Sequence, residues 1–179
     1  MGDGYIGERF STASYYYLAI ALISIPAMAL YASGSLRDFY MARTAENLAS
    51  RAYLIQDQVI ALLKNNDRNG LREAVKKLGA QSSTRITVIG ADGKVLADSM
   101  EDAADMDNHA DRPEFVQAMR SERGRSTRYS YTLDKELIYV AVPLKAEGRK
   151  AGVLRTSVPL TFLDRRLREI HVEIAVVAL

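Results

Sequence analysis

Residues 15 to 33 form an unbroken run, YYYLAIALISIPAMALYAS, without a single charged side chain. At about 1.5 Å of helical rise per residue, a run of this length spans about 30 Å, the thickness of the hydrocarbon core of a bilayer. Tyrosines lie at both ends of the run, where amphipathic rings favour the membrane–water interface. The sequence therefore predicts a transmembrane helix over residues 14–34, after a cytoplasmic amino terminus at residues 1–13.

A cleaved signal peptide is the alternative interpretation of this run, because Ala27-Met28-Ala29 resembles a cleavage site. Two observations favour an uncleaved anchor instead. The apolar run continues beyond that site, and the amino end carries Asp3 and Glu8 beside Arg9 rather than bases alone.

A second apolar run, VEIAVVAL, occupies residues 172–179. A run this short cannot cross a bilayer, so we expect residues 171–179 to be the start of a second transmembrane helix. A short helix packed on the preceding domain is the alternative. The bases around the first run do not favour a cytoplasmic amino terminus, because Arg9 precedes the run while Arg37 and Arg43 follow it.

Composition excludes several classes of function for the residues between these runs. The chain has no cysteine, so it can form neither disulfides nor thiol-based sites. It contains no P-loop, no Rossmann fingerprint and no recognisable Ser-His-Asp arrangement. Arg165, Arg166 and Arg168 precede the second run without interleaved aromatic residues, which favours contact with lipid headgroups over nucleic acid. We therefore expect no enzyme activity in this chain and no cofactor.

Acidic side chains are concentrated between residues 98 and 114, where Arg112 is the only base. Their spacing differs from that of an EF-hand loop, and a single histidine without cysteine does not make a zinc site. We interpret the stretch as a solvated acidic loop without a metal. Binding of Ca²⁺ or Mg²⁺, or bridging through cations to anionic lipid, is the alternative.

Hydrophobic spacing divides residues 35–170 into helices and strands. Helical spacing predicts a long helix over 35–65, continuing from the membrane helix, and shorter helices over 70–78, 113–121 and 161–171. Alternation and turn residues predict strands over 85–89, 94–98, 125–132, 137–143 and 151–159, with Asp92-Gly93 as a hairpin turn. We expect an α+β domain with a five-stranded antiparallel sheet, helices on one face, and strand 137–143 in a central position.

Four strings in this order resemble a known family: ITVIGADGKVLADS, NHADRPEF, YVAVPL and GVLRTSVPLTFLDRRLREI. They are similar to the extracytoplasmic PAS-like (Cache or PDC) sensor domains of bacterial two-component histidine kinases, most of all the phosphate-regulon class. The resemblance implies that residues 35–170 are a PAS-like (Cache) sensor domain outside the bacterial inner membrane. It also implies a second membrane helix that leads to a kinase, and no kinase sequence is present in this chain.

The expected function is therefore a membrane-anchored sensor module that detects a stimulus and passes it to a histidine kinase, with lipid and a second copy of the chain as partners. The ectodomain of a chemoreceptor or a diguanylate cyclase is one alternative. A ligand-free domain that docks a partner membrane protein is another, because the phosphate-regulon class receives signals partly through a transporter complex. A homodimer is expected through the apolar stripe Leu48, Ala52, Ile55 and Val59.

Arg112 is the strongest candidate for binding a small anionic ligand, since it directly precedes a predicted helix that begins at Pro113. The resemblance places a similar R-P-x-F segment beside the ligand pocket. Pairing with Asp111 or Glu114 to hold the acidic loop is the alternative. The further candidates, each with an ordinary structural role as its alternative, are Asp98, His109, Tyr129, Tyr131 and Tyr139.

Overall fold

A computed structural model describes residues 4–131, 133–146 and 148–160, with the backbone alone for residues 4–12 and Pro26. The chain divides into two units, Met1–Tyr40 and Met41–Leu179. The predicted closing helix over 161–171 and the second apolar run lie outside the described residues.

Helix α1 spans Gly4–Lys64, so the predicted membrane segment and the predicted long helix form one continuous element. Within the part of the chain that the structure describes, α1 is the one helix long and apolar enough to cross a membrane, judged by length and composition. The side chains of its apolar segment that the structure describes are mostly exposed.

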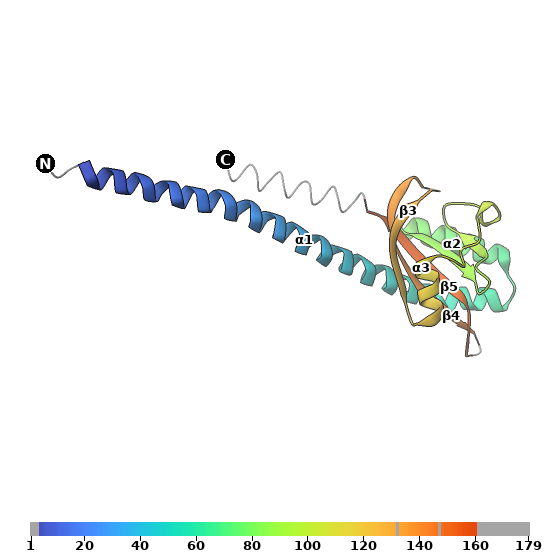
Figure 1. Cartoon of the computed structure of the whole chain (residues 1–179). Helices are drawn as coiled ribbons and strands as arrows, with labels where there is room; N and C mark the ends of the chain where they lie inside the picture. The colour runs from blue at the N-terminus through green and yellow to red at the C-terminus, as the bar shows by residue number, and fades with distance from the viewer. Residues whose placement is uncertain (1–3, 132, 147, 161–179) are drawn as a thin grey trace. The chain divides into compact units, whose positions relative to one another are not determined.

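The second unit is built on a five-stranded antiparallel sheet (Figure 1). Its strands are β1 (Arg85–Gly90), β2 (Val95–Asp98), β3 (Gly124–Ser130), β4 (Lys135–Ala146) and β5 (Arg149–Pro159), in the spatial order β2-β1-β5-β4-β3. The α+β class and the five-stranded sheet are as predicted. The central strand is β5, with β4 beside it as an inner strand.

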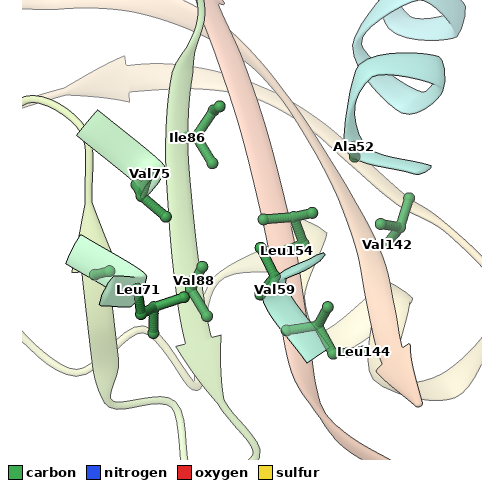
Figure 2. Close-up of a cluster of buried hydrophobic side chains, with 10 residues drawn as sticks. Ala52, Val59, Leu71, Val75, Ile86, Val88, Val142, Leu144 and Leu154 are labelled. Carbon is green, nitrogen blue, oxygen red and sulfur yellow. The ribbon is translucent and has the colours of Figure 1, made fainter. Parts of the chain in front are cut away.

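One face of the sheet is apolar and is covered by α1 and by α2 (Arg68–Ser82). Figure 2 shows Ala52 and Val59 of α1 and Leu71 and Val75 of α2 beside the side chains of the sheet. Burying a side chain of this size contributes roughly 1.5–3 kcal/mol relative to leaving it exposed. The strand residues of this cluster are Ile86, Val88, Ala97, Val142, Leu144 and Leu154.

Helix α2 does not end at Gly79 as the sequence predicted, but continues to Ser82 and is capped by Ser83 in the left-handed conformation. A Cβ atom at Gly79 would lie 2.5 Å from the Cβ of Ser99. The glycine therefore permits close packing of α2 on the residue that follows β2, and it does not terminate the helix.

The opposite face of the sheet carries the short helix α3 (Pro113–Arg120) and the 3-10 helix η1 (Ala103–Asp105), so helices cover both faces and not one face as predicted. Phe115 and Ala118 of α3 pack there on a second apolar cluster that includes Ile89, Ala141 and Val153. Apolar packing covers only part of this face. On the rest of this face, past the amino end of α3, the strands carry polar and charged side chains. These side chains form the candidate site.

Candidate ligand-binding site

Three strands share a short pattern, an arginine followed two residues later by a hydroxyl side chain. The pairs are Arg85 and Thr87 on β1, Arg128 and Ser130 on β3, and Arg155 and Ser157 on β5. Residues two apart in a strand point to the same face of the sheet. The observed register sets Thr87 opposite Arg155 and Arg85 opposite Ser157, so the strands gather these groups on the face that also carries α3.

Glu114 is the buried counter-ion of this cluster, placed there by the first turn of α3. Its carboxylate accepts hydrogen bonds from Arg128 Nη2 at 2.9 Å, Arg155 Nη1 at 3.1 Å and Ser126 Oγ at 2.6 Å. Burial alone would raise the pKa of Glu114, but the hydrogen bonds from Arg128 and Ser126 and the charge of Arg155 outweigh it and lower the pKa to about 2. The side chain is therefore a carboxylate at any physiological pH.

Asp98 holds the other end of the cluster. Arg85 Nε lies 3.0 and 3.1 Å from its two carboxylate oxygens, and Thr87 Oγ1 donates to it at 2.6 Å. The backbone N–H groups of Met100 and Glu101 donate to it as well. Thr87 also accepts a hydrogen bond from Arg155 Nη2 at 3.2 Å, so both buried carboxylates belong to one network that crosses β2, β1 and β5.

Tyr139 of β4 lies beside this network with its ring against two guanidinium groups. The Cζ atom of Arg128 lies 4.1 Å from the ring centroid, and that of Arg155 lies 5.0 Å from it. Such contacts hold the arginines by cation–π attraction while leaving their N–H groups directed elsewhere.

A cavity of about 140 Å³ opens above these residues. Arg85, Arg112, Arg128 and Arg155 line it, together with Tyr139. Its remaining walls come from the loop between β2 and α3 and from the end of β3: Glu101, Asp102, Asp105, Met106, Asp107, His109, Ser130 and Tyr131. The cavity thus combines four cations with a ring of loop carboxylates, which we call the acidic rim (Glu101, Asp102, Asp105 and Asp107).

Several buried polar atoms of the lining residues have no hydrogen-bond partner among the described residues. They are Arg85 Nη2, His109 Nδ1, Arg112 Nε and Arg155 Nε. Ser157 Oγ is in the same state on the strand that carries Arg155. Buried polar groups in folded proteins are nearly always paired, so a concentration of unpaired guanidinium nitrogens around one cavity indicates a place for an acceptor.

The loop that carries His109 is fixed by the β1–β2 turn. His109 N–H donates to the carbonyl of Gly93 at 2.8 Å, and Asn108 Nδ2 donates to the carbonyl of Asp92 at 2.9 Å. Gly93 has a φ of 82°, and a Cβ atom there would lie 2.5 Å from the Cβ of Ala110. Burial and the charges of Arg155, Arg112 and Arg128 lower the pKa of His109 to about 4, so the imidazole is neutral near pH 7.

The structure brings four of the six predicted site residues together around the cavity: His109, Arg112, Tyr131 and Tyr139. Arg112 Nε forms an ion pair with Asp111 Oδ1 at 3.6 Å, as the structural alternative expected, although the distance is too long for a hydrogen bond. Glu114, the other expected partner, is held by Arg128 and Arg155. Asp98 does not line the cavity, but it forms an ion pair with Arg85, which lines it. Tyr129 stacks edge-on with Tyr131 and bonds to Asp134, also outside the lining.

Sequence reasoning missed Arg85, Arg128, Arg155 and Glu114. Arg85 and Arg155 lie in strands of mostly buried residues, and a buried arginine needs a partner for its charge, so the sequence held a partial signal. Recognising it required the pairing of β1 with β5, which brings residues about 70 positions apart into contact. Among the described residues, no group of three or more His, Cys, Asp or Glu side chains could hold a metal ion.

Comparison with known proteins gives the family context of this geometry. The family model described as single Cache-like matches residues 39–159. No curated protein matches the chain in sequence.

Solved sensor domains share the fold at low identity. The sensor domain of the V. cholerae histidine kinase DctB has a TM-score of 0.60 and 17% identity, with 78% of this chain and 57% of that chain covered. The sensory domain of the Campylobacter jejuni chemoreceptor Tlp3, with isoleucine bound, has a TM-score of 0.60 and 14% identity, with 88% of this chain and 66% of that chain covered. The ligand-binding domain of the Pseudomonas fluorescens chemoreceptor CtaA, in complex with L-serine, has a TM-score of 0.56 and 15% identity, with 77% of this chain and 62% of that chain covered. This chain spans less than two thirds of the length of each.

Proposed function

The chain belongs to the single Cache-like family, and from that premise we propose that it is a membrane-anchored sensor module that binds a small anionic ligand outside the bacterial inner membrane. One observation carries this proposal. Arg85, Arg112 and Arg155, which line one cavity, each keep a buried guanidinium nitrogen that makes no hydrogen bond among the described residues. An anion in the cavity would satisfy them, and charge-assisted hydrogen bonds of this kind are about twice as strong as neutral ones.

Strand β5 offers a direct path from the cavity to α1. Arg155 reaches the cavity from one face of β5, and the next residue, Thr156, faces the other way. Thr156 Oγ1 donates to the backbone carbonyl of Leu48 in α1 at 3.0 Å. Gln56 of α1 also donates to the carbonyl of Pro143 in β4 at 2.7 Å. A ligand that moves Arg155 would therefore displace β5 against α1, which continues into the proposed membrane segment.

For the output, we propose a histidine kinase beyond residue 179, with a chemoreceptor as the second candidate. The two have equal support, since the structural neighbours include both a kinase sensor domain and chemoreceptor domains. The division that we propose is a cytoplasmic amino terminus at 1–13, a membrane helix at 14–34, the sensor domain at 35–170 and the start of a second membrane helix at 171–179. A homodimer and contacts with lipid headgroups complete the proposed assembly.

Thermal unfolding of the chain in lipid nanodiscs tests ligand binding. We expect acetate, sulfate, phosphate or a short dicarboxylate at millimolar concentration to raise the melting temperature, because a ligand bound only to the folded state stabilises it by mass action. The Arg112→Gln variant should lose most of this shift, whereas Arg120→Gln, the same charge change at an exposed position outside the cavity, should keep it. If no anion shifts the transition in the unaltered chain, a domain that docks a partner protein becomes the better interpretation.

A further inference from the structure

We propose that the ligand is a compact dianion, both of whose charges lie inside the cavity, and not a zwitterionic amino acid of the kind named in the structural neighbours. This inference rests on the proposed anion-sensing function and specifies its ligand. It follows from the charges, the unpaired donors and the positions of the carboxylates around the cavity.

The interior of the site has a surplus of positive charge. Four guanidinium groups line the cavity, and only two carboxylates are buried with them, those of Asp98 and Glu114. His109 adds no charge near pH 7, because its pKa is lowered to about 4 by burial and the adjacent arginines. Asp111 forms an ion pair with Arg112 at 3.6 Å, but its carboxylate is 78% exposed, so water and salt weaken the pair. Two of the four positive charges thus have no buried carboxylate to compensate them, and a dianion inside the cavity would balance them.

The unpaired donors are distributed over three sides of the cavity. Arg85 enters from β1, Arg155 from β5 and Arg112 from the loop before α3, and each has one buried nitrogen without an acceptor. A single carboxylate has two oxygens and could reach two of these sides. A tetrahedral oxyanion or a short dicarboxylate carries more acceptor oxygens and could bond to all three.

An amino acid would also require an acceptor for its ammonium group, and the buried carboxylates are already occupied. Asp98 and Glu114 have no exposed side-chain surface, and their oxygens accept from arginines, hydroxyls and backbone N–H groups. Neither residue lines the cavity. Only the acidic rim remains. Asp102, Asp105 and Asp107 are exposed there, and Glu101 is half-buried, so an ion pair with the rim is largely open to water and contributes little.

The acidic rim repels an approaching anion, but the repulsion is weaker than the attraction inside. Interactions between charges in the interior are several times stronger than between charges exposed to water, and salt screens the rim first. The rim should therefore slow association more than it weakens affinity. Added salt should accelerate the binding of a dianion as it screens the rim.

The volume of about 140 Å³ limits the size of the occupant. Pockets that bury drug-sized ligands measure about 300–1,000 Å³. A cavity of this scale suits a small ligand such as sulfate, phosphate or a dicarboxylate of a few carbons.

Calorimetric titration with ligand pairs that differ by one charge tests the inference. The chain in nanodiscs would be titrated at constant ionic strength with succinate against its monoamide succinamate, and with sulfate against methyl sulfate. Isoleucine and serine form a third arm. We expect the dianion of at least one pair to bind roughly tenfold tighter or more than its monoanionic match, the factor given by about 1.4 kcal/mol. Which pair responds distinguishes a dicarboxylate from an inorganic oxyanion.

Variants separate charge from geometry. Arg112→Gln should reduce the preference for the dianion to a few-fold, Arg112→Lys should retain most of it, and Arg120→Gln should leave it unchanged. Equal or tighter binding of the monoanions or of the amino acids would overturn the dianion inference and leave anion or amino-acid sensing in place. Failure of every compound to bind would overturn the proposed function as well.

Discussion

Glu114 shows how one side chain can determine the chemistry of the whole site. It lies in the first turn of α3 with no exposed surface, where a carboxylate is normally too costly to bury. It persists there because Arg128 and Arg155 approach it from two different strands. These contacts leave other nitrogens of the cluster free for a ligand, so Glu114 fixes the arginines without neutralising all of them.

Replacing Glu114 with Gln should destabilise the domain strongly. The variant removes the counter-ion of two arginines, and breaking a buried ion pair from one side typically costs about 3–5 kcal/mol. We expect a loss of about 3 kcal/mol in urea unfolding, with partial recovery in sulfate because an added anion can replace the missing charge. Glu122→Gln is the matched control, since Glu122 pairs with Lys145 at the exposed surface and its replacement should change stability little. Equal losses in the two variants would contradict the assigned role.

Acid should destabilise the domain in two stages. The folded-state pKa of His109 is about 4, below its unfolded value of about 6.5, so the folded protein binds fewer protons and stability falls as the pH drops from 6.5 to 4. The pKa of Glu114 is about 2 instead of 4.5, so a second loss follows between pH 4.5 and 2.

The first stage belongs to His109 and can be isolated. His109→Gln should flatten the dependence of unfolding free energy on pH between 6.5 and 4, an effect of at most about 3 kcal/mol. The imidazole NMR resonances of His109 should stay in the neutral form until the pH approaches 4. Titration of His109 near pH 6.5 would show that the imidazole is neither buried nor influenced by the arginines.

At the scale of elements, β5 has two roles because its alternate residues face opposite layers. Arg155 and Ser157 belong to the polar network, while Leu154 and Thr156 face the α1 layer. A strand in the centre of the sheet transmits displacement to both neighbours, since β1 and β4 are hydrogen-bonded along its length.

The bond between Thr156 and Leu48 can be removed without changing side-chain volume by Thr156→Val. We expect a loss of about 1 kcal/mol in unfolding free energy, the usual net value of a buried hydrogen bond, and unchanged affinity for the ligand. Thr127→Val at an exposed position of β3 is the control and should be near neutral. In a membrane assay, ligand-dependent signalling should weaken in the first variant alone. Full signalling by Thr156→Val would rule out this bond as the connection to α1.

Local patterns predicted the elements well because turns and periodicity act over a few residues. Asp92-Gly93 gave the β1–β2 hairpin, and Gly93 has the positive φ that this turn needs. Pro113 predicted the start of α3, and the helix begins at that residue. The order of strands and the arginine network were not predictable in this way, since they depend on contacts such as Thr87 with Arg155 that no local rule encodes.

At the scale of the whole molecule, the structure changes the surface through which a homodimer could form. The predicted stripe includes Leu48, Ala52 and Val59, which are buried against the domain's own sheet. The opposite side of α1 carries an exposed row at alternating spacings of three and four residues: Asn47, Ser50, Leu54, Asp57 and Ala61. This is the spacing of a coiled-coil seam, and Leu54 is 83% exposed.

Single cysteines in this cysteine-free chain test the dimer surface. Leu54→Cys and Ala61→Cys should cross-link in membranes, and Ala52→Cys should not, because position 52 is fully buried. Cross-linking that is absent at both exposed positions would argue against a dimer through α1.

The orientation in the membrane is the last property of the whole molecule to test, and here the charges and the family disagree. The arrangement of Arg9, Arg37 and Arg43 does not favour a cytoplasmic amino terminus, whereas a sensor of the single Cache-like family is expected to face outward. We expect the family to prevail, because three bases are a weak signal for orientation.

A membrane-impermeant maleimide distinguishes the two orientations in intact cells. Ala80→Cys places a thiol at an exposed position of α2 and should be labelled at once if the sensor domain lies outside the cytoplasm as we propose. Gly2→Cys, in the proposed cytoplasmic segment, should be labelled only after the cells are opened. The reverse pattern would place the arginine cavity in the cytoplasm, where its ligand would be an internal metabolite and the proposed direction of signalling would be wrong.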